Sequence, residues 1–557
     1  MPQEKDFTVS AAELFKYITK EKKDVGAIYI YAVLSGLFQL SIPLGIQAIV
    51  SFVMGASMVT SLYLLIIFVV LGTFLVGFFR IKVMQIIEKI QQKIFVEYAV
   101  AFAKKIPRIN LSSSKKYFLP ELVNRFFDTQ NLQKGISKIL LDIPTALMQI
   151  SFGILLLSFY HVWFLVFGVL VIIIVISIFK FTMNSGIRSS LEESDRKYEV
   201  ASWLEDVASA VKTFKINSKA DMHLAGTDER VIKYLQRRTS HFKVLEFQYK
   251  TIIGFKVIIT LAMLAIGTYL LVNQKLNIGA FIATEIVVLT ILNAVERLIK
   301  SLESYYDVIA ALVKLNKVTE FGEEQNGEIA LEQQFGGMEV TLRDLSFAFN
   351  DRKPILKNIT FNVRPNTINV IYGKLDAGKT TLLNVMAGFY EATSGAIMFD
   401  KIPLKNLDKI ALRDKIGFYT PDMVIIKGTL LDNILFGRTG ISTEDIMRLC
   451  ERIGLDNLAS QFSKGFDTML SETDTEVSYS GKKKITLLRA LLGNSRLIML
   501  EDPLYGMDED FKEKLVNYLQ KIKKHTTIII VSRAPELLDI ADQKLRLEDG
   551  TIELDYI

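Results

Sequence analysis

Eight consecutive residues, Gly373-Lys-Leu-Asp-Ala-Gly-Lys-Thr380, have the types and the spacing that bind phosphate groups. They fit the phosphate-loop pattern G-x-x-x-x-G-K-[ST], in which glycines let backbone N–H groups surround phosphate oxygens. Lys379 is expected to reach the β- and γ-phosphates, and the hydroxyl of Thr380 to hold Mg²⁺. The pattern predicts a nucleotide site, and its structural alternative is an ordinary Gly-Lys-Thr loop between a strand and a helix.

The segments around this loop are those that a phosphate loop requires. An apolar strand at 368–372 precedes it, and a helical run at 381–387 follows it and points its positive N-terminal end at the phosphates. The residues that we expect to contact the nucleotide here are Gly373, Lys374, Leu375, Asp376, Ala377, Gly378, Lys379, Thr380 and Thr381.

The sequence from residue 338 onward alternates strand-like and helix-like segments. Apolar strands are predicted at 339–342, 345–349, 359–363, 368–372, 496–500 and 526–531. The last two are apolar throughout, as strands buried on both faces of a parallel sheet are. We therefore expect an α/β domain over 337–557, after a polar linker at 320–336.

Composition separates this domain from the first part of the chain. Half of the 557 residues are hydrophobic and the mean hydropathy is +0.30, and the apolar runs crowd the first 300 residues. Six of these runs approach the ~20 residues that a membrane-spanning helix needs. We place them at 26–53, 62–79, 139–159, 162–179, 252–272 and 278–299.

Charge placement predicts how these spans are oriented. The stretches 80–134 and 180–250 are rich in Lys and Arg, whereas 54–61 and 158–161 carry no charge. Positive segments stay in the cytoplasm, so both termini, the long connections and the α/β domain are expected there. Helical spacing at 81–104 and 191–214 predicts that the membrane helices extend into the cytoplasm, which completes a domain over 1–319.

Several other classes of site are not supported by composition. The net charge of +6 gives no argument for a nucleic-acid partner. The single cysteine, Cys450, excludes an internal disulfide, and neither it nor the four histidines have metal-ligand spacing.

Polar residues inside the spans are candidates for a substrate path. Glu285 is the first choice for a substrate-facing or ion-facing position, and interhelical packing is its equally weighted alternative. Lys256 lies close to a cytoplasmic end, where we expect interhelical packing or a side chain that reaches out of the membrane, and Pro43 is expected to bend the first span. The remaining polar residues in the spans are Gln39, Gln47, Asp142 and Gln149.

These features together resemble an ABC exporter half-transporter over essentially the whole chain. Six spans with helical extensions are followed by a phosphate loop, a Leu-Leu-Arg-Ala-Leu-Leu helix at 487–492, a strand ending in Glu501-Asp502 and a strand at 528–531. General similarity of the membrane half is closest to bacterial peptide, bacteriocin and type I secretion exporters. The resemblance implies an all-α six-helix transmembrane domain followed by an α/β P-loop ATPase domain.

The family assigns roles to particular positions of this sequence. Phe349 would stack on adenine, Glu501 would hold Mg²⁺ with Thr380, and Asp502 would act as general base. Ser478, Ser480 and Gly481 stand in the signature segment that completes the ATP site of a second chain. The resemblance therefore implies ATP and Mg²⁺ as cofactors, and a homodimer or a heterodimer with a related half-transporter.

Several positions depart from the family pattern. Pro421 replaces the Gln that senses Mg²⁺ and water, Tyr479 replaces a signature Gly, and Ser532 replaces the His that contacts the γ-phosphate. The two acids stand in reversed order, and Asp376 places a negative charge inside the phosphate loop, whereas Glu472 and Asp508 are retained. Lost donors and displaced carboxylates predict weak ATP hydrolysis.

Three functions follow as expectations. The first is an ATP-binding exporter in the bilayer of a bacterial inner membrane, which moves a peptide, protein or lipophilic compound out of the cytoplasm with slow ATPase activity. The second is a catalytically inactive relative in which nucleotide binding is regulatory or structural. The third is a channel or exporter driven by an ion gradient through Glu285. The secretion-group resemblance also permits a periplasmic adaptor.

Overall fold

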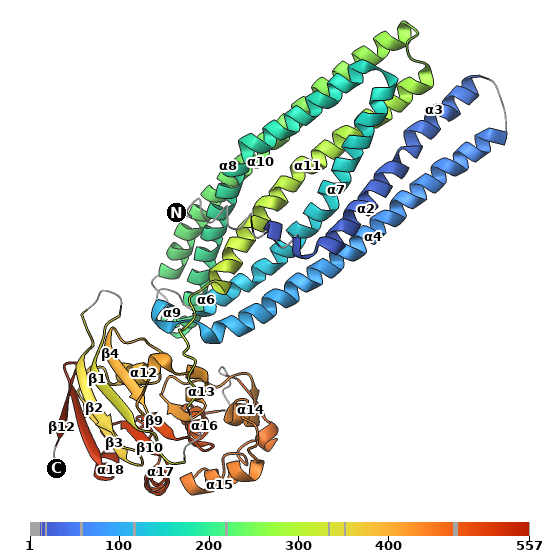
Figure 1. Cartoon of the computed structure of the whole chain (residues 1–557). Helices are drawn as coiled ribbons and strands as arrows, with labels where there is room; N and C mark the ends of the chain where they lie inside the picture. Colours follow the sequence, from blue (N-terminus) through green and yellow to red (C-terminus); the bar gives the residue numbers. More distant parts are fainter. Residues whose placement is uncertain are drawn as a thin grey trace. The chain divides into compact units, whose positions relative to one another are not determined.

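The computed structural model describes residues 12, 14–16, 19–55, 60–114, 119–217, 221–331, 335–349, 353–471 and 477–555. It divides into two compact units. The first contains residues 1–108 and 117–321, and the second contains residues 109–116 and 322–557. Figure 1 shows the first as a bundle of long helices and the second as an α/β unit.

The helical unit is built mainly from long helices. Its long helices are α2 (Lys22–Gln39), α3 (Ser41–Met54), α4 (Thr60–Lys105), α7 (Asp128–Tyr160), α8 (Val162–Ser209), α10 (Met222–Val272) and α11 (Ile278–Thr319). Its short elements are η1 (Ile106–Arg108), α6 (Leu119–Asn124), η2 (Arg125–Phe127) and α9 (Val211–Ile216).

Six helical stretches of the described chain are long and apolar enough to cross a membrane. A helix satisfies its own backbone hydrogen bonds, so it is the form in which such a sequence can enter lipid. The first stretch, 22–54, is interrupted at Leu40, directly before α3, and Pro43 is the third residue of α3. The break agrees with the bend expected from Pro43, because proline lacks the N–H that would continue a helix.

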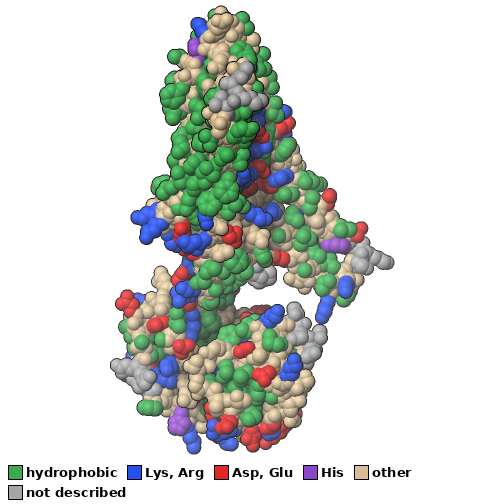
Figure 2. Space-filling model, turned by 90° about the vertical axis from the view of Figure 1, so that its right-hand side faces the viewer, with side chains coloured by type: hydrophobic (Ala, Val, Ile, Leu, Met, Phe, Trp, Pro, Cys, Tyr) green, Lys and Arg blue, Asp and Glu red, His purple; other side chains and the backbone are tan. Residues whose placement is uncertain are grey.

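The outer face of this bundle is apolar. Large hydrophobic side chains such as Leu64, Ile67 and Phe68 of α4 are more than half exposed, and Figure 2 shows a continuous hydrophobic surface over much of the long helices. An apolar surface of this extent suits lipid contact. The chain is thus a multi-pass membrane protein.

The described residues of the second unit form three sheets. The four-stranded sheet has the order β2-β1-β4-β5, the six-stranded sheet β12-β11-β3-β10-β9-β6, and the small sheet β7-β8. The strands are β1 (Val340–Phe347), β2 (Leu356–Val363), β3 (Ile368–Gly373), β4 (Ser394–Phe399), β5 (Ile402–Pro403), β6 (Ile416–Tyr419), β7 (Gly428–Thr429), β8 (Met469–Leu470), β9 (Leu497–Glu501), β10 (Thr527–Val531), β11 (Gln543–Glu548) and β12 (Thr551–Asp555).

The six-stranded sheet forms the core that positions the site. Strands β11, β3, β10, β9 and β6 are parallel, and β9 and β10 are buried over their whole length. Parallel strands are covered by helices on both faces, which explains why these two segments are apolar throughout. The separate strands expected at 339–342 and 345–349 form one strand, β1, whose pairing with β2 shifts between Leu342 and Leu345.

Apart from α5 (Leu111–Ser114), which precedes the first strand in the sequence, the helices of this unit lie between its strands. They are α12 (Lys379–Met386), η3 (Leu404–Asn406), α13 (Lys409–Arg413), α14 (Leu430–Leu435), α15 (Thr443–Ile453), η4 (Gly465–Asp467), α16 (Tyr479–Leu491), α17 (Glu509–Ile522) and α18 (Pro535–Asp539). Because β3, β9 and β10 are parallel, the loops after them meet at one edge of the sheet. Open α/β sheets bind their ligands at this edge.

Candidate nucleotide site

The phosphate loop joins β3 to α12, and two of its glycines are required by geometry. A Cβ on Gly373 would lie 1.9 Å from the backbone oxygen of Leu547, so no side chain fits there. Gly378 has a φ of +97° directly before α12, a conformation that L side chains rarely adopt. The loop thus turns its backbone into the N-terminal end of a helix, which is the arrangement that binds phosphate.

The ammonium group of Lys379 is held at the loop. Its Nζ donates to the backbone oxygens of Gly373 at 3.1 Å and Lys374 at 2.5 Å. Burial lowers the pKa of Lys379, and the charge of Arg533 lowers it further. Arg533 also belongs to the loop's surroundings, because its Nε donates to the oxygen of Gly373 at 2.6 Å. Sequence reasoning missed this second cation.

Lys374 does not offset the negative charge of Asp376. Its ammonium group pairs with Glu548 of β11 and its side chain is 76% exposed. Asp376 has a φ of +60°, in the left-handed region that Asp tolerates better than most residues, and it lines the same cavity as Lys379. Lys379 is therefore the loop lysine that opposes the Asp376 charge.

Glu501 ends β9 and faces Thr380. The hydroxyl of Thr380 donates to Oε1 of Glu501, whereas Oε2 is buried without a hydrogen-bond partner among the described residues. Burial raises the pKa of Glu501; the bond from Thr380 opposes this shift, and the charge of Asp502 adds to it. A hydroxyl and a carboxylate with a free oxygen are oxygen ligands of the kind that Mg²⁺ prefers, so the two residues fit that ion.

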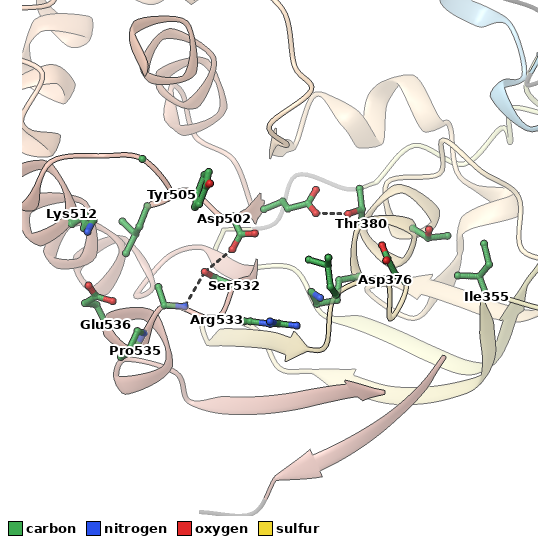
Figure 3. A pocket seen from close by; sticks show the side chains of 18 residues that line it. Ile355, Asp376, Thr380, Asp502, Tyr505, Lys512, Ser532, Arg533, Pro535 and Glu536 are labelled. Carbon is green, nitrogen blue, oxygen red and sulfur yellow. Dashed lines mark hydrogen bonds between the residues drawn. The ribbon is translucent and has the colours of Figure 1, made fainter. Parts of the chain in front are cut away.

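Asp502 follows β9 and is fixed by the neighbouring strand. Its backbone N–H donates to the oxygen of Val531 at 2.8 Å, and its φ of +42° turns the side chain out of the strand direction. The hydroxyl of Ser532 donates to Oδ1 of Asp502 at 2.9 Å (Figure 3). Ser532 is 3% exposed and accepts in turn from the N–H of Ala534 at 3.3 Å. A carboxylate and a hydroxyl thus stand beside the phosphate loop.

These residues line one cavity of about 770 Å³. Eight of the predicted residues belong to its lining: Leu375, Asp376, Gly378, Lys379, Thr380, Thr381, Glu501 and Asp502. Sequence reasoning missed Ile355, Tyr505, Lys512 and Glu536 as cavity residues. None of these four residues belongs to a sequence motif, and they come from separate segments before β2, after β9, in α17 and in α18, so only the folded structure brings them together.

The remaining predicted residues of the described chain lie outside this lining. Phe349 is half-buried and packs edge-on against Phe347 and Tyr390, with ring centroids 4.6 and 5.3 Å away. Ser478 caps α16 by accepting from the N–H of Gly481 at 3.1 Å, and its hydroxyl lies 3.2 Å from that of Ser480. Their roles toward a nucleotide stay predictions.

The departures from the family pattern have visible consequences. Pro421 follows β6 and carries no amide, and the exposed neighbour Asp422 adds negative charge toward Glu501. Tyr479 begins α16 and is 68% exposed. The ammonium group of Lys483 lies 4.6 Å from its ring and 4.9 Å from the ring of Tyr505. Glu472 lies outside the described residues, whereas Asp508 caps α17 and pairs with Lys484 at 2.9 Å.

The helical unit contains a polar cavity of about 360 Å³. It is lined by Gln39, Gln149, Thr290, Asn293, Glu296, Arg297 and Lys300. Arg297 donates to Gln149, which donates to Gln39, and Glu296 pairs with Lys256 and Lys300. Sequence reasoning named Gln39, Gln149 and Lys256 but missed Glu296 and Arg297.

Glu285 lies elsewhere on α11. It is half-buried, and its Oε2 has no hydrogen-bond partner among the described residues. The lining of the polar cavity does not include it. No group of three or more His, Cys, Asp or Glu residues in the described part could hold a metal ion.

Comparisons with known proteins agree with this geometry. A family model described as the ABC transporter transmembrane region matches residues 25–295, and one described as ABC transporter matches residues 356–505, which indicates ATP binding. YknV of Bacillus subtilis, an uncharacterized ABC transporter ATP-binding protein, is 25% identical over 295 residues, which are 52% of this chain and 48% of that protein. This chain thus spans about half the length of that relative.

Two further matches cover more of the chain. LagD of Lactococcus lactis, a lactococcin-G-processing and transport ATP-binding protein, is 20% identical over 83% of this chain and 67% of its own. The structure of a bacterial Atm1-family ABC exporter with ATP bound matches with a TM-score of 0.82 at 17% identity, over 95% of this chain and 94% of that one. The chain belongs to the ABC transporter family, with its transmembrane region and its ATP-binding domain fused in one polypeptide.

Proposed function

We propose that this protein is an exporter that moves a substrate out of a bacterial cytoplasm across the inner membrane, with slow hydrolysis of ATP. The observation that carries the proposal is the bond from Thr380 to Glu501 beside Lys379, in a chain that also has six candidate spans. A working phosphate-binding site on a membrane transporter makes ATP the source of energy. The cytoplasmic location of the ATP-binding domain is part of the proposal.

Each residue has a proposed task at the reacting phosphate. Thr380 and Glu501 would hold Mg²⁺, which neutralises phosphate charge when it is bound. Lys379 binds the β- and γ-phosphates, and Arg533 adds positive charge at the same loop. Asp502 accepts the proton of the attacking water, and Ser532 fixes the orientation of that carboxylate.

The same residues explain why hydrolysis should be slow. The carboxylate of Asp502 is one methylene shorter than the Glu of the family pattern, and Ser532 offers a short hydroxyl where the family has an imidazole. Removing one preorganised donor from the developing charge commonly costs ~10²–10³ in rate. Both ATP sites of a dimer would share such defects, because this chain supplies Asp502 and Ser532 to one site and Tyr479 to the other. The dimer partner, a second copy or a related half-transporter, is part of the proposal.

The test is the rate of ATP hydrolysis by the purified full chain in lipid, with Lys379→Ala as the blank. Turnover above the blank supports an exporter that is driven by ATP. The second candidate function, a regulatory nucleotide-binding membrane protein, is favoured by Pro421 and Ser532. Saturable ATP binding with no turnover above the blank would exclude an exporter powered by this chain alone and would favour either this second function or an exporter that needs a related half-transporter.

We also propose that the polar cavity around Arg297 contacts the substrate. Cells with the wild-type chain should release a solute that cells with Lys379→Ala retain, and mass spectrometry of the medium identifies it. Arg297→Gln is expected to reduce this release by about tenfold, since a hydrogen bond to a charged group contributes about 1.5–3 kcal/mol. Lys275→Gln, in the turn after α10, is the control. Equal release by Arg297→Gln and wild type would exclude the cavity, and loss of release in Glu285→Gln alone would favour the path through Glu285.

A further inference from the structure

The α/β unit has a second large cavity, at the sheet edge opposite the phosphate loop. Its volume is about 1130 Å³, and it includes Arg496 directly before β9 and Thr526 directly before β10. The nucleotide cavity lies at the other ends of the same strands, at Glu501 and Ser532. We call this second cavity the basic groove.

The lining of the basic groove carries one sign of charge. It contains the five cations Lys415, Arg452, Arg496, Lys514 and Lys521, together with His525, and no Asp or Glu. A cavity of about 800 Å³ in the helical unit shows the contrast, because its lining mixes both signs and pairs Arg237 with Glu192 at 2.6 Å. The lining of the basic groove therefore differs from that of the other cavity, because it holds no carboxylate that could neutralise its cations.

Two of the five cations are already neutralised. Arg496 pairs with Asp400 at 2.7 Å and donates to the oxygen of Gly336 at 3.0 Å, and Lys514 pairs with Asp510 at 2.8 Å. Lys415, Arg452 and Lys521 form no ion pair with a carboxylate within the described chain. They come from three separate elements, the turn before β6, α15 and α17, and they converge on one cavity.

The floor of the basic groove is fixed by the strands. The backbone oxygen of Lys415 accepts from the N–H of Arg496 at 2.9 Å, and the hydroxyl of Thr526 donates to the oxygen of Ser495 at 3.0 Å. Asn494 and Asn517 add amide groups to the lining. The groove thus combines a rigid floor, neutral hydrogen-bonding groups and three unpaired cations.

We propose that the basic groove binds a small polyanion that carries at least two phosphate groups. Three convergent cations recognise clustered negative charge, and a planar guanidinium matches the geometry of a phosphate oxygen pair. The volume of about 1130 Å³ is slightly above the ~300–1,000 Å³ that is typical of small-molecule sites, so it leaves room for a ligand with several phosphate groups. One phosphate carries about −1.5 to −2 charge at pH 7 and a carboxylate carries one negative charge, both less than the three positive charges, which is why the proposal requires more than one anionic group.

This polyanion is distinct from the ATP of the phosphate loop, and β9 runs from one site to the other. Ile498, the second residue of β9, lines the basic groove, and Glu501 ends β9 at the nucleotide cavity. Helix α16 likewise ends at Leu491, a groove residue, and begins at Tyr479. A ligand in the groove therefore contacts the elements that carry Glu501 and the signature segment, which makes it a candidate regulator of the nucleotide site.

The test uses the full-length chain in nanodiscs of phosphatidylcholine and inorganic tripolyphosphate as the probe. Binding is measured by titration calorimetry on the Lys379→Ala variant, because this substitution weakens binding at the phosphate loop. We expect saturable binding of one tripolyphosphate per chain, with an affinity that falls as salt rises. Arg452→Glu with Lys521→Glu should weaken it by at least tenfold, because each lost charged contact is worth about 1.5–3 kcal/mol.

The matched control is Lys405→Glu, an exposed lysine of η3 outside the groove, which should leave the affinity unchanged. In a chain with intact Lys379, unchanged ATP binding by the double variant shows that the domain is folded. Equal tripolyphosphate affinity in the double variant and the parent would overturn the proposal. So would the absence of saturable binding, or binding only to phosphatidylglycerol vesicles or to RNA.

Discussion

The nucleotide cavity has two halves that differ in how well they are built. The half that holds phosphate keeps Gly373, Gly378 and Lys379 in the geometry that the motif requires. The half that we propose to cleave phosphate has a carboxylate, Asp502, that is one methylene shorter than the Glu of the family pattern, and a hydroxyl, Ser532, where that pattern has an imidazole. The two halves lie at one edge of one sheet, so the fold alone does not explain the difference.

The two halves differ in how strongly their chemistry depends on the positions of individual side chains. Binding at the phosphate loop depends on backbone N–H groups and a helix end, which the sheet and α12 fix. Cleavage depends on side-chain atoms that must reach a water molecule, and a misplacement of 1 Å can cost about a hundredfold in rate. We therefore expect this protein to keep its affinity for ATP more fully than its turnover.

The largest effect is expected from Lys379→Ala. Removing the ammonium group that the loop holds should weaken ATP binding by at least a hundredfold, since each charge-assisted bond to phosphate is worth about 1.5–3 kcal/mol and Lys379 makes more than one. Titration of ATP into the full chain measures it. Lys374→Ala is the matched control, because Lys374 pairs with Glu548 and should change affinity by less than about threefold. Equal losses of ATP affinity in Lys379→Ala and Lys374→Ala would contradict the prediction, because both lysines would then contribute equally to ATP binding.

The second prediction repairs the weaker half. Ser532→His combined with Pro421→Gln should raise ATP turnover by about ten- to a hundredfold, because the pair restores a donor to the γ-phosphate and an amide near the attacking water. Phosphate release measures it, with Lys379→Ala in the same background as the blank. Ser532→Ala should instead lower any residual turnover, because Asp502 loses its hydrogen bond. A repaired chain that stays inactive would place the defect in the short reach of Asp502.

Sequence reasoning identified what depends on local motifs and missed what depends on packing. The phosphate loop, the buried strands β9 and β10 and the six spans all follow from the pattern of single segments. Arg533 was missed because its contact with Gly373 joins two loops that are 160 positions apart in the sequence. Lys374 could not be assigned its partner for the same reason, since β11 pairs with β3 only in the folded sheet.

The membrane half shows the same limit. Glu296 and Arg297 lie near the end of the span predicted at 278–299. They were missed because that span was identified from its apolar residues. Only the packing of α7 and α10 against α11 shows that Arg297 reaches Gln149 and that Glu296 pairs with Lys256. A count of ionisable residues along the span would have found both positions, though not their partners.

The third prediction concerns the free energy of unfolding that the protein loses by burying the charged carboxylate of Glu501 beside Thr380. Its pKa is raised above the ordinary 4.5 by burial, so the folded state binds this proton more tightly than the unfolded state. The stability that protonation gives is fully present below pH 4.5 and is lost as the pH rises through the folded pKa. Glu501→Gln removes the buried charge and should stabilise the nucleotide-free protein at pH 7 by about 1 kcal/mol, or ~2–4 °C in Tm.

Thermal unfolding of the full chain at pH 7 and near pH 4 tests this. The gap between wild type and Glu501→Gln should shrink at the lower pH, because wild-type Glu501 is then neutral as well. Asp510→Asn is the control, since Asp510 is an exposed residue of α17 that pairs with Lys514. If wild type and Glu501→Gln have the same Tm at pH 7, the prediction is contradicted, and Oε2 of Glu501 has a hydrogen-bond partner in solution.

The smallest effect is expected from Asp376, the one charge that weakens the phosphate-holding half. Asp376→Asn keeps a residue that tolerates the φ of +60° and removes the negative charge that Lys379 opposes. ATP should bind about threefold more tightly, and the gain should shrink at high salt, because exposed charges are screened. Asp376→Gly separates the effect of charge from that of backbone conformation. If both variants gain the same affinity for ATP, the charge of Asp376 causes the whole effect. If only Asp376→Gly gains affinity, the backbone conformation causes it. If neither variant binds ATP more tightly, Lys379 already cancels the Asp376 charge, and the weakness of the site lies entirely in its hydrolytic half.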